Sequence, residues 1–184
     1  KLEVAADNEI SGQLTFVGDC TINAGVNQVT INSLLIGTDG LTFTGGAVDE
    51  PSGDTIINGP ASQLSGDIDI IGTQVSILSG NGLGGAGEGD VLLYGGGLAS
   101  GAAVSFCGDL IIRGDAFILA LVSEITVRDL KGLLADGTPQ FSLRDILGGD
   151  NATIPSQSLI DDIGFGDDQV TGGGNLVLDD AVEC

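Results

Sequence analysis

The chain has 184 residues and a formal net charge of −21, from 5 Lys and Arg against 26 Asp and Glu, and it contains no His. Five cations cannot neutralise a run of phosphates, which argues against a nucleic-acid partner, and without His neither a Ser-His-Asp nor a Cys-His catalytic arrangement can form. Disorder and a helical fold are also disfavoured, because 42% of the residues are hydrophobic and the 32 Gly are poor helix formers.

Apolar and polar residues alternate along much of the chain, which is the pattern of a β-strand with one buried face. In chain order, this alternation predicts strands at residues 13–16, 28–31, 41–44, 67–70, 74–77, 103–106, 124–127 and 175–178. Denser apolar pieces at residues 56–57, 91–93, 110–112 and 117–119 predict strands that are covered on both faces.

The dipeptide Gly-Asp separates many of these segments and occurs eight times, with Asp at positions 19, 54, 67, 90, 109, 115, 150 and 167. Gly tolerates positive φ and Asp can hydrogen-bond its own following backbone, so each Gly-Asp predicts a tight corner that leads into a short strand. The corners are unevenly spaced, which disfavours a regular solenoid period. We therefore expect an all-β fold of short strands, built either as stacked β-arches or as an irregular β-sandwich or solenoid.

Two features suggest an internal division of the chain. Residues 16–22 and 106–112 share a loose pattern around Gly-Asp, and residues 80–89 contain six Gly. These features predict two β-rich halves, residues 1–84 and residues 85–184 with an acidic C-terminal tail, unless the chain forms a single continuous domain.

The region between residues 128 and 147 is the least strand-like. Its apolar residues recur at i+3 or i+4 in residues 128–134 and 141–147, which predicts at most one or two short helical turns. Four of the five cations lie between residues 113 and 144, so this stretch is the one best able to pair with an acidic face of a neighbouring molecule.

No residue is predicted to be catalytic, and we do not expect an enzyme. Adjacent carboxylates such as Asp161 and Asp162 could hydrolyse glycosides, but the chain has one Tyr and no Trp to form sugar-binding platforms. The longest purely apolar run, residues 116–122, is far shorter than the roughly 20 residues of a membrane span, so none is expected.

Calcium is the one cofactor that the sequence suggests. Residues 164–175 resemble the RTX nonapeptide, with Gly at the turn and Asp168 at the ligand position after Asp167, and residues 84–92 resemble it with one residue inserted. RTX loops bind Ca²⁺ between successive tandem turns, whereas these two copies are single and far apart. Asp167 and Asp168 are the candidate Ca²⁺ ligands, and no other cofactor is expected.

The three cysteines, Cys20, Cys107 and Cys184, form no CxxC pair. The chain begins at Lys1 and contains no Met, which predicts processing and export into an oxidising compartment. An odd number of cysteines then suggests an intermolecular disulfide or a free thiol, and Cys184 at the chain end could reach a neighbouring subunit. The alternative is that one or more of them are buried, inert thiols.

Taken together, the Gly-Asp corners, the three cysteines and the start at Lys1 resemble the sheath proteins of filamentous methanogenic archaea. That resemblance implies an exported, amyloid-like β protein that resists denaturants and builds tubular hoops around cells as a protective, semi-permeable wall. It also implies that Cys20, Cys107 and Cys184 form cross-links between subunits.

We therefore expect an extracellular structural protein whose partner is another copy of itself. It would assemble by β-sheet pairing between subunits and by disulfide cross-links into a sheath, tube or fibre of the cell envelope. The competing hypothesis is a calcium-dependent extracellular adhesin or surface-layer module. A halophilic soluble protein would also explain the negative charge, through solvation alone.

Overall fold

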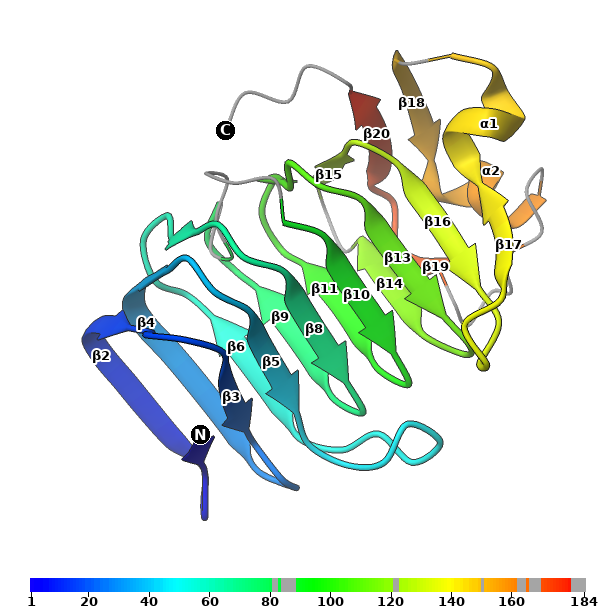
Figure 1. Cartoon of the computed structure of the whole chain (residues 1–184). Helices are drawn as coiled ribbons and strands as arrows, with labels where there is room; N and C mark the ends of the chain where they lie inside the picture. Colours follow the sequence, from blue (N-terminus) through cyan, green and yellow to red (C-terminus); the bar gives the residue numbers. More distant parts are fainter. Residues whose placement is uncertain are drawn as a thin grey trace.

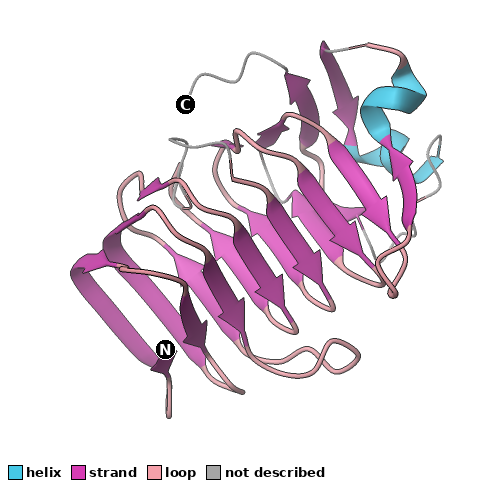
Figure 2. Ribbon diagram, in the orientation of Figure 1, coloured by secondary structure: helices cyan, strands magenta, loops and turns pink. Residues whose placement is uncertain are grey.

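The computed structural model describes residues 1–80, 83, 89–120, 123–149, 151–161, 165 and 170–179. The fold is nearly all β, with 53% strand and 6% helix, and it forms a β-solenoid of about six turns. Successive turns stack strand upon strand, so the molecule is built of layers (Figures 1 and 2). The predicted all-β fold of stacked short strands is confirmed.

The first long sheet takes one strand from each turn. In stacking order it contains β1 (Leu2–Glu3), β3 (Cys20–Asn23), β5 (Leu41–Thr44), β8 (Ile68–Ile71), β10 (Val91–Tyr94), β13 (Leu110–Arg113), β16 (Leu130–Leu133) and β17 (Pro139–Ser142). Its described pairs are parallel until the last, where β17 runs antiparallel to β16.

The second long sheet faces the first, and a third short sheet extends the later turns. In stacking order the second sheet contains β2 (Asn8–Thr15), β4 (Gln28–Gly37), β6 (Asp54–Ile57), β9 (Gln74–Ile77), β11 (Gly97–Ser100), β14 (Phe117–Ala120) and β19 (Val170–Thr171), while β7 (Gln63–Leu64) pairs with the far end of β4. The third sheet contains β12 (Val104–Ser105), β15 (Glu124–Val127), β20 (Asn175–Asp179) and β18 (Asn151–Pro155), with β18 antiparallel to β20.

One hydrophobic core runs along the solenoid between the two long sheets. Alternate side chains of each strand point inward and stack in columns, of which one contains Leu41, Ile68, Val91, Leu110 and Leu130. Both sheets continue past residue 85, because β8 pairs with β10 and β9 pairs with β11. The core therefore contains side chains from both of the predicted halves.

The densest apolar strands were predicted to be covered on both faces, and this is only partly right. In β10 and β13 the inward side chains are buried, whereas the outward Leu92 and Ile111 are half-buried. The outward Thr42 of β5 and Asp69 of β8 are half-buried in the same way, so burial does not explain why β10 and β13 are apolar on both faces.

The Gly-Asp corners before β8, β10 and β13 stack in a column of their own. The N–H of Asp90 donates to Asp67 Oδ1 at 2.9 Å, and the N–H of Asp109 donates to Asp90 Oδ1 at 2.8 Å. A Cβ on Gly89 would lie 2.3 Å from the carbonyl oxygen of Gly66, so only Gly fits where the corners stack.

The six corners from Asp19 to Asp115 each lead into a short strand as predicted, while Asp150 and Asp167 lie outside the described residues. The carboxylates of Asp67 and Asp90 accept from the next turn of the solenoid and not from their own following backbone. The corner spacing is uneven because Asp54 and Asp115 lead into strands of the second sheet, β6 and β14, and because the loops of each turn differ in length.

The last turn contains an insertion that closes one end of the solenoid. After β16 the chain forms β17, α1 (Leu143–Leu147), β18 and α2 (Ser156–Asp161) before β19 and β20 rejoin their sheets. In Figure 2 both helices lie at this end of the molecule. Neither described helix is long enough to cross a membrane.

The helical predictions for this region were half right. Residues 141–147 do contain α1, which begins where Ser142 Oγ accepts the N–H of Asp145 and ends at Gly148 with φ 66°. The helical turn predicted for residues 128–134 was wrong, because Leu130–Leu133 forms the strand β16. Its parallel pairing with β13 overrides the weak helical spacing. Helix α2 was not predicted.

Candidate assembly edge

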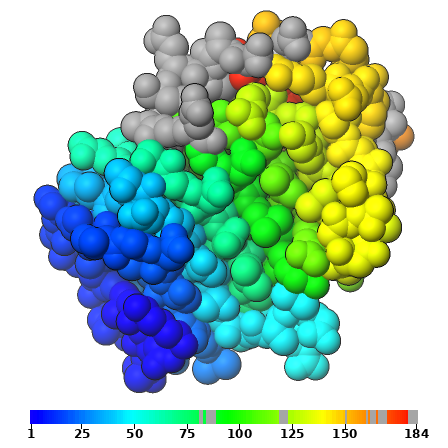
Figure 3. Space-filling model, viewed as in Figure 1, coloured from blue at the N-terminus to red at the C-terminus, as the bar shows by residue number. Residues whose placement is uncertain are grey.

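The two ends of the solenoid are finished differently. At the C-terminal end, the antiparallel strands β17 and β18 close two of the sheets and the helices pack beside them. At the N-terminal end, β1 and β2 are the last strands of the two long sheets, and each pairs with a single described neighbour, β3 or β4. Figure 3 shows these N-terminal residues in blue at one end of the molecule. At the opposite end lies the yellow segment that contains β17 and α1, which we call the closing segment.

Strand β2 is the longer of the two edge strands. It pairs with β4 without a break from Asn8 opposite Val29 to Thr15 opposite Ile36. Beyond β2, the N–H of Phe16 donates to the carbonyl oxygen of Ile36 at 2.8 Å. Because backbone groups alternate in direction along a strand, the N–H and C=O groups of alternate residues point away from β4. These are the groups of Glu9, Ser11, Gln13 and Thr15, of which the N–H of Glu9 already donates to Asn8 Oδ1 at 2.8 Å.

A hollow opens between β1 and β2 at this end. Its volume is about 610 Å³, and its apolar lining includes Leu2, Val4, Ile10 and Leu14. Ile10 and Leu14 are half-buried and pack against the main core. Among the described residues, no layer covers this end of the core.

Two apolar side chains in the loops that follow β2 and β3 are strongly exposed. Val17 is 88% exposed and Val26 is 83% exposed, more than the other large apolar side chains of the described residues. We call β1, β2 and the hollow between them the open edge.

The open edge carries little charge for so acidic a protein. Among the residues of β2 only Glu9 is charged, and its Oε1 accepts a hydrogen bond from Asn32 Nδ2 at 2.5 Å. Lys1 Nζ lies 2.8 Å from Glu3 Oε1, and this hydrogen bond lowers the pKa of Glu3. Two subunits would therefore meet little charge repulsion along β2.

The corner aspartates near the closed end are paired within the subunit. Arg128 Nε lies 2.7 Å from Asp109 Oδ1, Lys131 Nζ bonds Asp109 Oδ2, and Arg128 Nη2 lies 3.4 Å from Asp90 Oδ1. Burial alone would raise the pKa of Asp109, but the hydrogen bonds from Arg128 and Lys131 bring it below its ordinary value. The same bond raises the pKa of Lys131. These two cations, predicted to be available for a neighbour, are already engaged.

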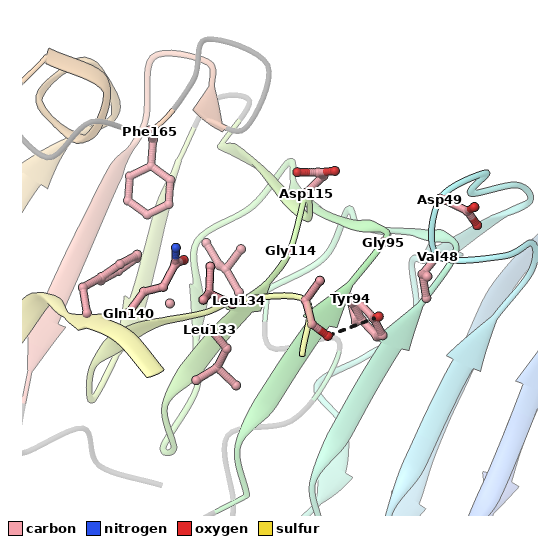
Figure 4. A pocket seen from close by; sticks show the side chains of 14 residues that line it. Val48, Asp49, Tyr94, Gly95, Gly114, Asp115, Leu133, Leu134, Gln140 and Phe165 are labelled. Atoms are coloured by element: carbon pink, nitrogen blue, oxygen red, sulfur yellow. Dashed lines mark hydrogen bonds between the residues drawn. The ribbon is translucent and has the colours of Figure 1, made fainter. Parts of the chain in front are cut away.

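A second hollow, also of about 610 Å³, lies beside the closing segment (Figure 4). Tyr94, Phe141 and Phe165 line it together with Asp49 and Asp115. The Arg113 guanidinium lies 4.4 Å from the centre of the Tyr94 ring, and Phe141 and Phe165 contact edge to face at 5.4 Å. The sequence analysis missed this hollow because its aromatic side chains are far apart in the chain and follow no motif.

The structure accounts for some of the predicted site residues. Cys20 is a free thiol, half-buried, and occupies the inward column next to Leu41. Cys107 is disulfide-bonded. Cys184 and the calcium candidates Asp167 and Asp168 lie outside the described residues. Within the described part of the chain, no group of three or more Cys, Asp or Glu side chains is placed to hold a metal ion.

Comparison of the chain with protein-family models, with curated proteins and with solved structures finds no match. The function is therefore argued from the geometry of this molecule.

Proposed function

We propose that this protein is a structural subunit that assembles with copies of itself, by β-sheet pairing at the open edge, into an extracellular sheath, tube or fibre. The observation that carries this proposal is the contrast between the two ends. Both long sheets stop at the same N-terminal face, in β1 and β2, where the core is also uncovered.

The physical reason is that an unpaired edge strand is a template for another strand. Soluble proteins usually protect such edges with Lys, Pro, a short strand or a covering loop. Strand β2 is eight residues long and contains neither Lys nor Pro. Each backbone hydrogen bond added by a partner contributes about 0.5–1.5 kcal/mol net, and covering the apolar hollow contributes further.

The distribution of charge is consistent with ordered growth. A net charge of −21 keeps the outer surface hydrated and opposes random clumping. Repulsion along β2 is low, because Glu9 is its single charged side chain. Subunits would therefore associate through this edge in preference to other faces.

A matched pair of substitutions tests the proposal. Ile10→Lys places a charge at the open edge, whereas Ile146→Lys makes the same change at an exposed position, 58% accessible, on α1 at the closed end. Sedimentation velocity and negative-stain microscopy should show self-association of the unaltered chain and of Ile146→Lys, and at least about tenfold weaker association of Ile10→Lys.

A second variant guards against a folding defect in Ile10→Lys. Gln13→Pro removes an N–H that points away from β4, so the bonds between β2 and β4 remain, and Pro is tolerated on edge strands. Gln13→Ala, which keeps the N–H, is its control. A chain that stays monomeric at high concentration, or that assembles equally well as Gln13→Pro, would refute assembly through this edge.

A further inference from the structure

We infer that two copies join at their open edges about a two-fold axis that passes between Gly12 of one copy and Gly12 of the other, with each β2 antiparallel to the other. This inference rests on the proposed function and specifies the orientation and register of the partner. It follows from three features of the described residues: the edges available at each end, the direction of the free backbone groups, and the side chains of β2.

The available edges favour joining like ends. If the open edge stacked on the closed end of another copy, the second sheet would offer only β19, which has two residues, Val170 and Thr171. The first sheet would offer β17, which begins at Pro139 and already reverses the strand direction. Pairing between two β2 strands can instead extend over most of their eight residues.

The strand geometry then limits the register. Two antiparallel strands bond through residues whose N–H and C=O groups point toward each other. In β2 these are the odd-numbered residues from Glu9 to Thr15, so an odd-numbered residue must lie opposite an odd-numbered one. This rule also keeps inward side chains opposite inward side chains, so that the core of one copy continues into the other.

The side chains select one register among those allowed. When Gly12 lies opposite its own copy, Ile10 lies opposite Leu14 on the inner face. On the outer face Ser11 then lies opposite Gln13, and Glu9 lies opposite Thr15, so no like charges meet. A shift by two residues in one direction would put Asn8 opposite Leu14 in the core, and the opposite shift would leave Leu14 facing Gly12.

Gly12 suits a position beside the axis, opposite its own copy. Its φ is +100°, a conformation that favours Gly, and a Cβ at this position would contact no other atom of the subunit within 4 Å. The same two-fold axis brings the two β1 strands and the two hollows together. Leu2 and Val4 of both copies then line one joined core.

Cysteine cross-linking tests the register. Ser11→Cys and Gln13→Cys are made separately on a Cys20→Ser background, mixed under assembling conditions and oxidised with oxidised glutathione. Residues directly opposite in an antiparallel pair have Cβ atoms about 4.5–5.5 Å apart, near enough for a disulfide after small adjustments. We expect the mixture to give a cross-linked dimer of one Ser11→Cys chain and one Gln13→Cys chain, at least about tenfold faster than either variant alone.

The other outcomes separate failure of the register from failure of the proposed function. Fast cross-linking of Ser11→Cys to itself, or of Gln13→Cys to itself, would show a register shifted by two residues and would overturn the inference. Assembled protein with no cross-link in any combination would overturn the two-fold pairing while leaving self-assembly intact. Protein that remains monomeric in sedimentation would overturn both.

Discussion

The closed and open ends of this solenoid show two ways of ending the same stack of strands. At the closed end the chain reverses direction in β17 and β18, and the buried Leu143 of α1 lies beside the last turns. At the open end the parallel pattern simply stops, with Ile10 and Leu14 half-buried. Stacking of strands alone therefore does not complete such a fold, because the strands and the core at each end still need to be covered.

The largest effect is expected from making the same truncation at both ends. Leu143→Ala removes a fully buried side chain at the closed end and should lower the free energy of unfolding by about 2–5 kcal/mol. Leu14→Ala should cost about 1 kcal/mol in the monomer, because Leu14 is half-buried there. Urea denaturation of dilute protein measures both values. Equal losses would mean that the open end is as well packed as the closed one.

A smaller effect is expected in the column of corner aspartates. Asp109→Asn weakens the bonds to Arg128 and Lys131 and should cost about 1–2 kcal/mol, since solvent screens both partly exposed cations. Asp67→Asn should cost less than about 0.5 kcal/mol, because an amide oxygen can still accept the N–H of Asp90.

The pH dependence of stability sharpens the same comparison. The folded-state pKa of Asp109 is lowered, so its contribution is present above its ordinary pKa of 3.8 and is lost as the pH falls through the lower folded value. The stability difference between the unaltered chain and Asp109→Asn should therefore shrink when urea titrations at neutral pH are repeated at about pH 2. A difference that stays constant would exclude the ion pairs as its cause.

The smallest effect is expected from removing divalent cations. If pairing at the open edge holds the assembly together, an excess of EDTA should leave the sedimentation profile unchanged. Dissociation or unfolding on adding EDTA, reversed by Ca²⁺, would instead support the calcium-dependent adhesin or surface-layer module and a role for Asp167 and Asp168.

Much of the fold could be predicted from residues that repeat in every turn. The alternation in residues 41–44, 74–77 and 124–127 predicts strands that the structure contains, because the inward columns are filled mainly by apolar side chains. The Gly-Asp corners were likewise informative, since Gly is required where Gly66, Gly89 and Gly108 stack. The number and order of the turns could not be predicted. Loops of unequal length separate the strands, so strands that pair in register lie at irregular distances along the sequence.

The candidate site was harder to predict, for a physical reason. Only the second half of β2 was predicted, as a strand at residues 13–16, and the alternation there does not mark an edge. Strand β2 is special because no other described strand follows it in the stack. Being an edge is a property of the topology and not of residues 8–15 themselves. The low charge of this strand was visible in the sequence, but its meaning depends on knowing that Glu9 to Thr15 lie at an end.

The antiparallel closure at β17 and β18 has a consequence for any long polymer. If the first junction joins like ends, growth beyond a pair needs a second, different junction between closed ends, and the two kinds must alternate. A filament built in this way would look the same from either tip and would have no plus or minus direction. Elongation rates at its two tips would be equal, and a single type of terminating molecule would stop both.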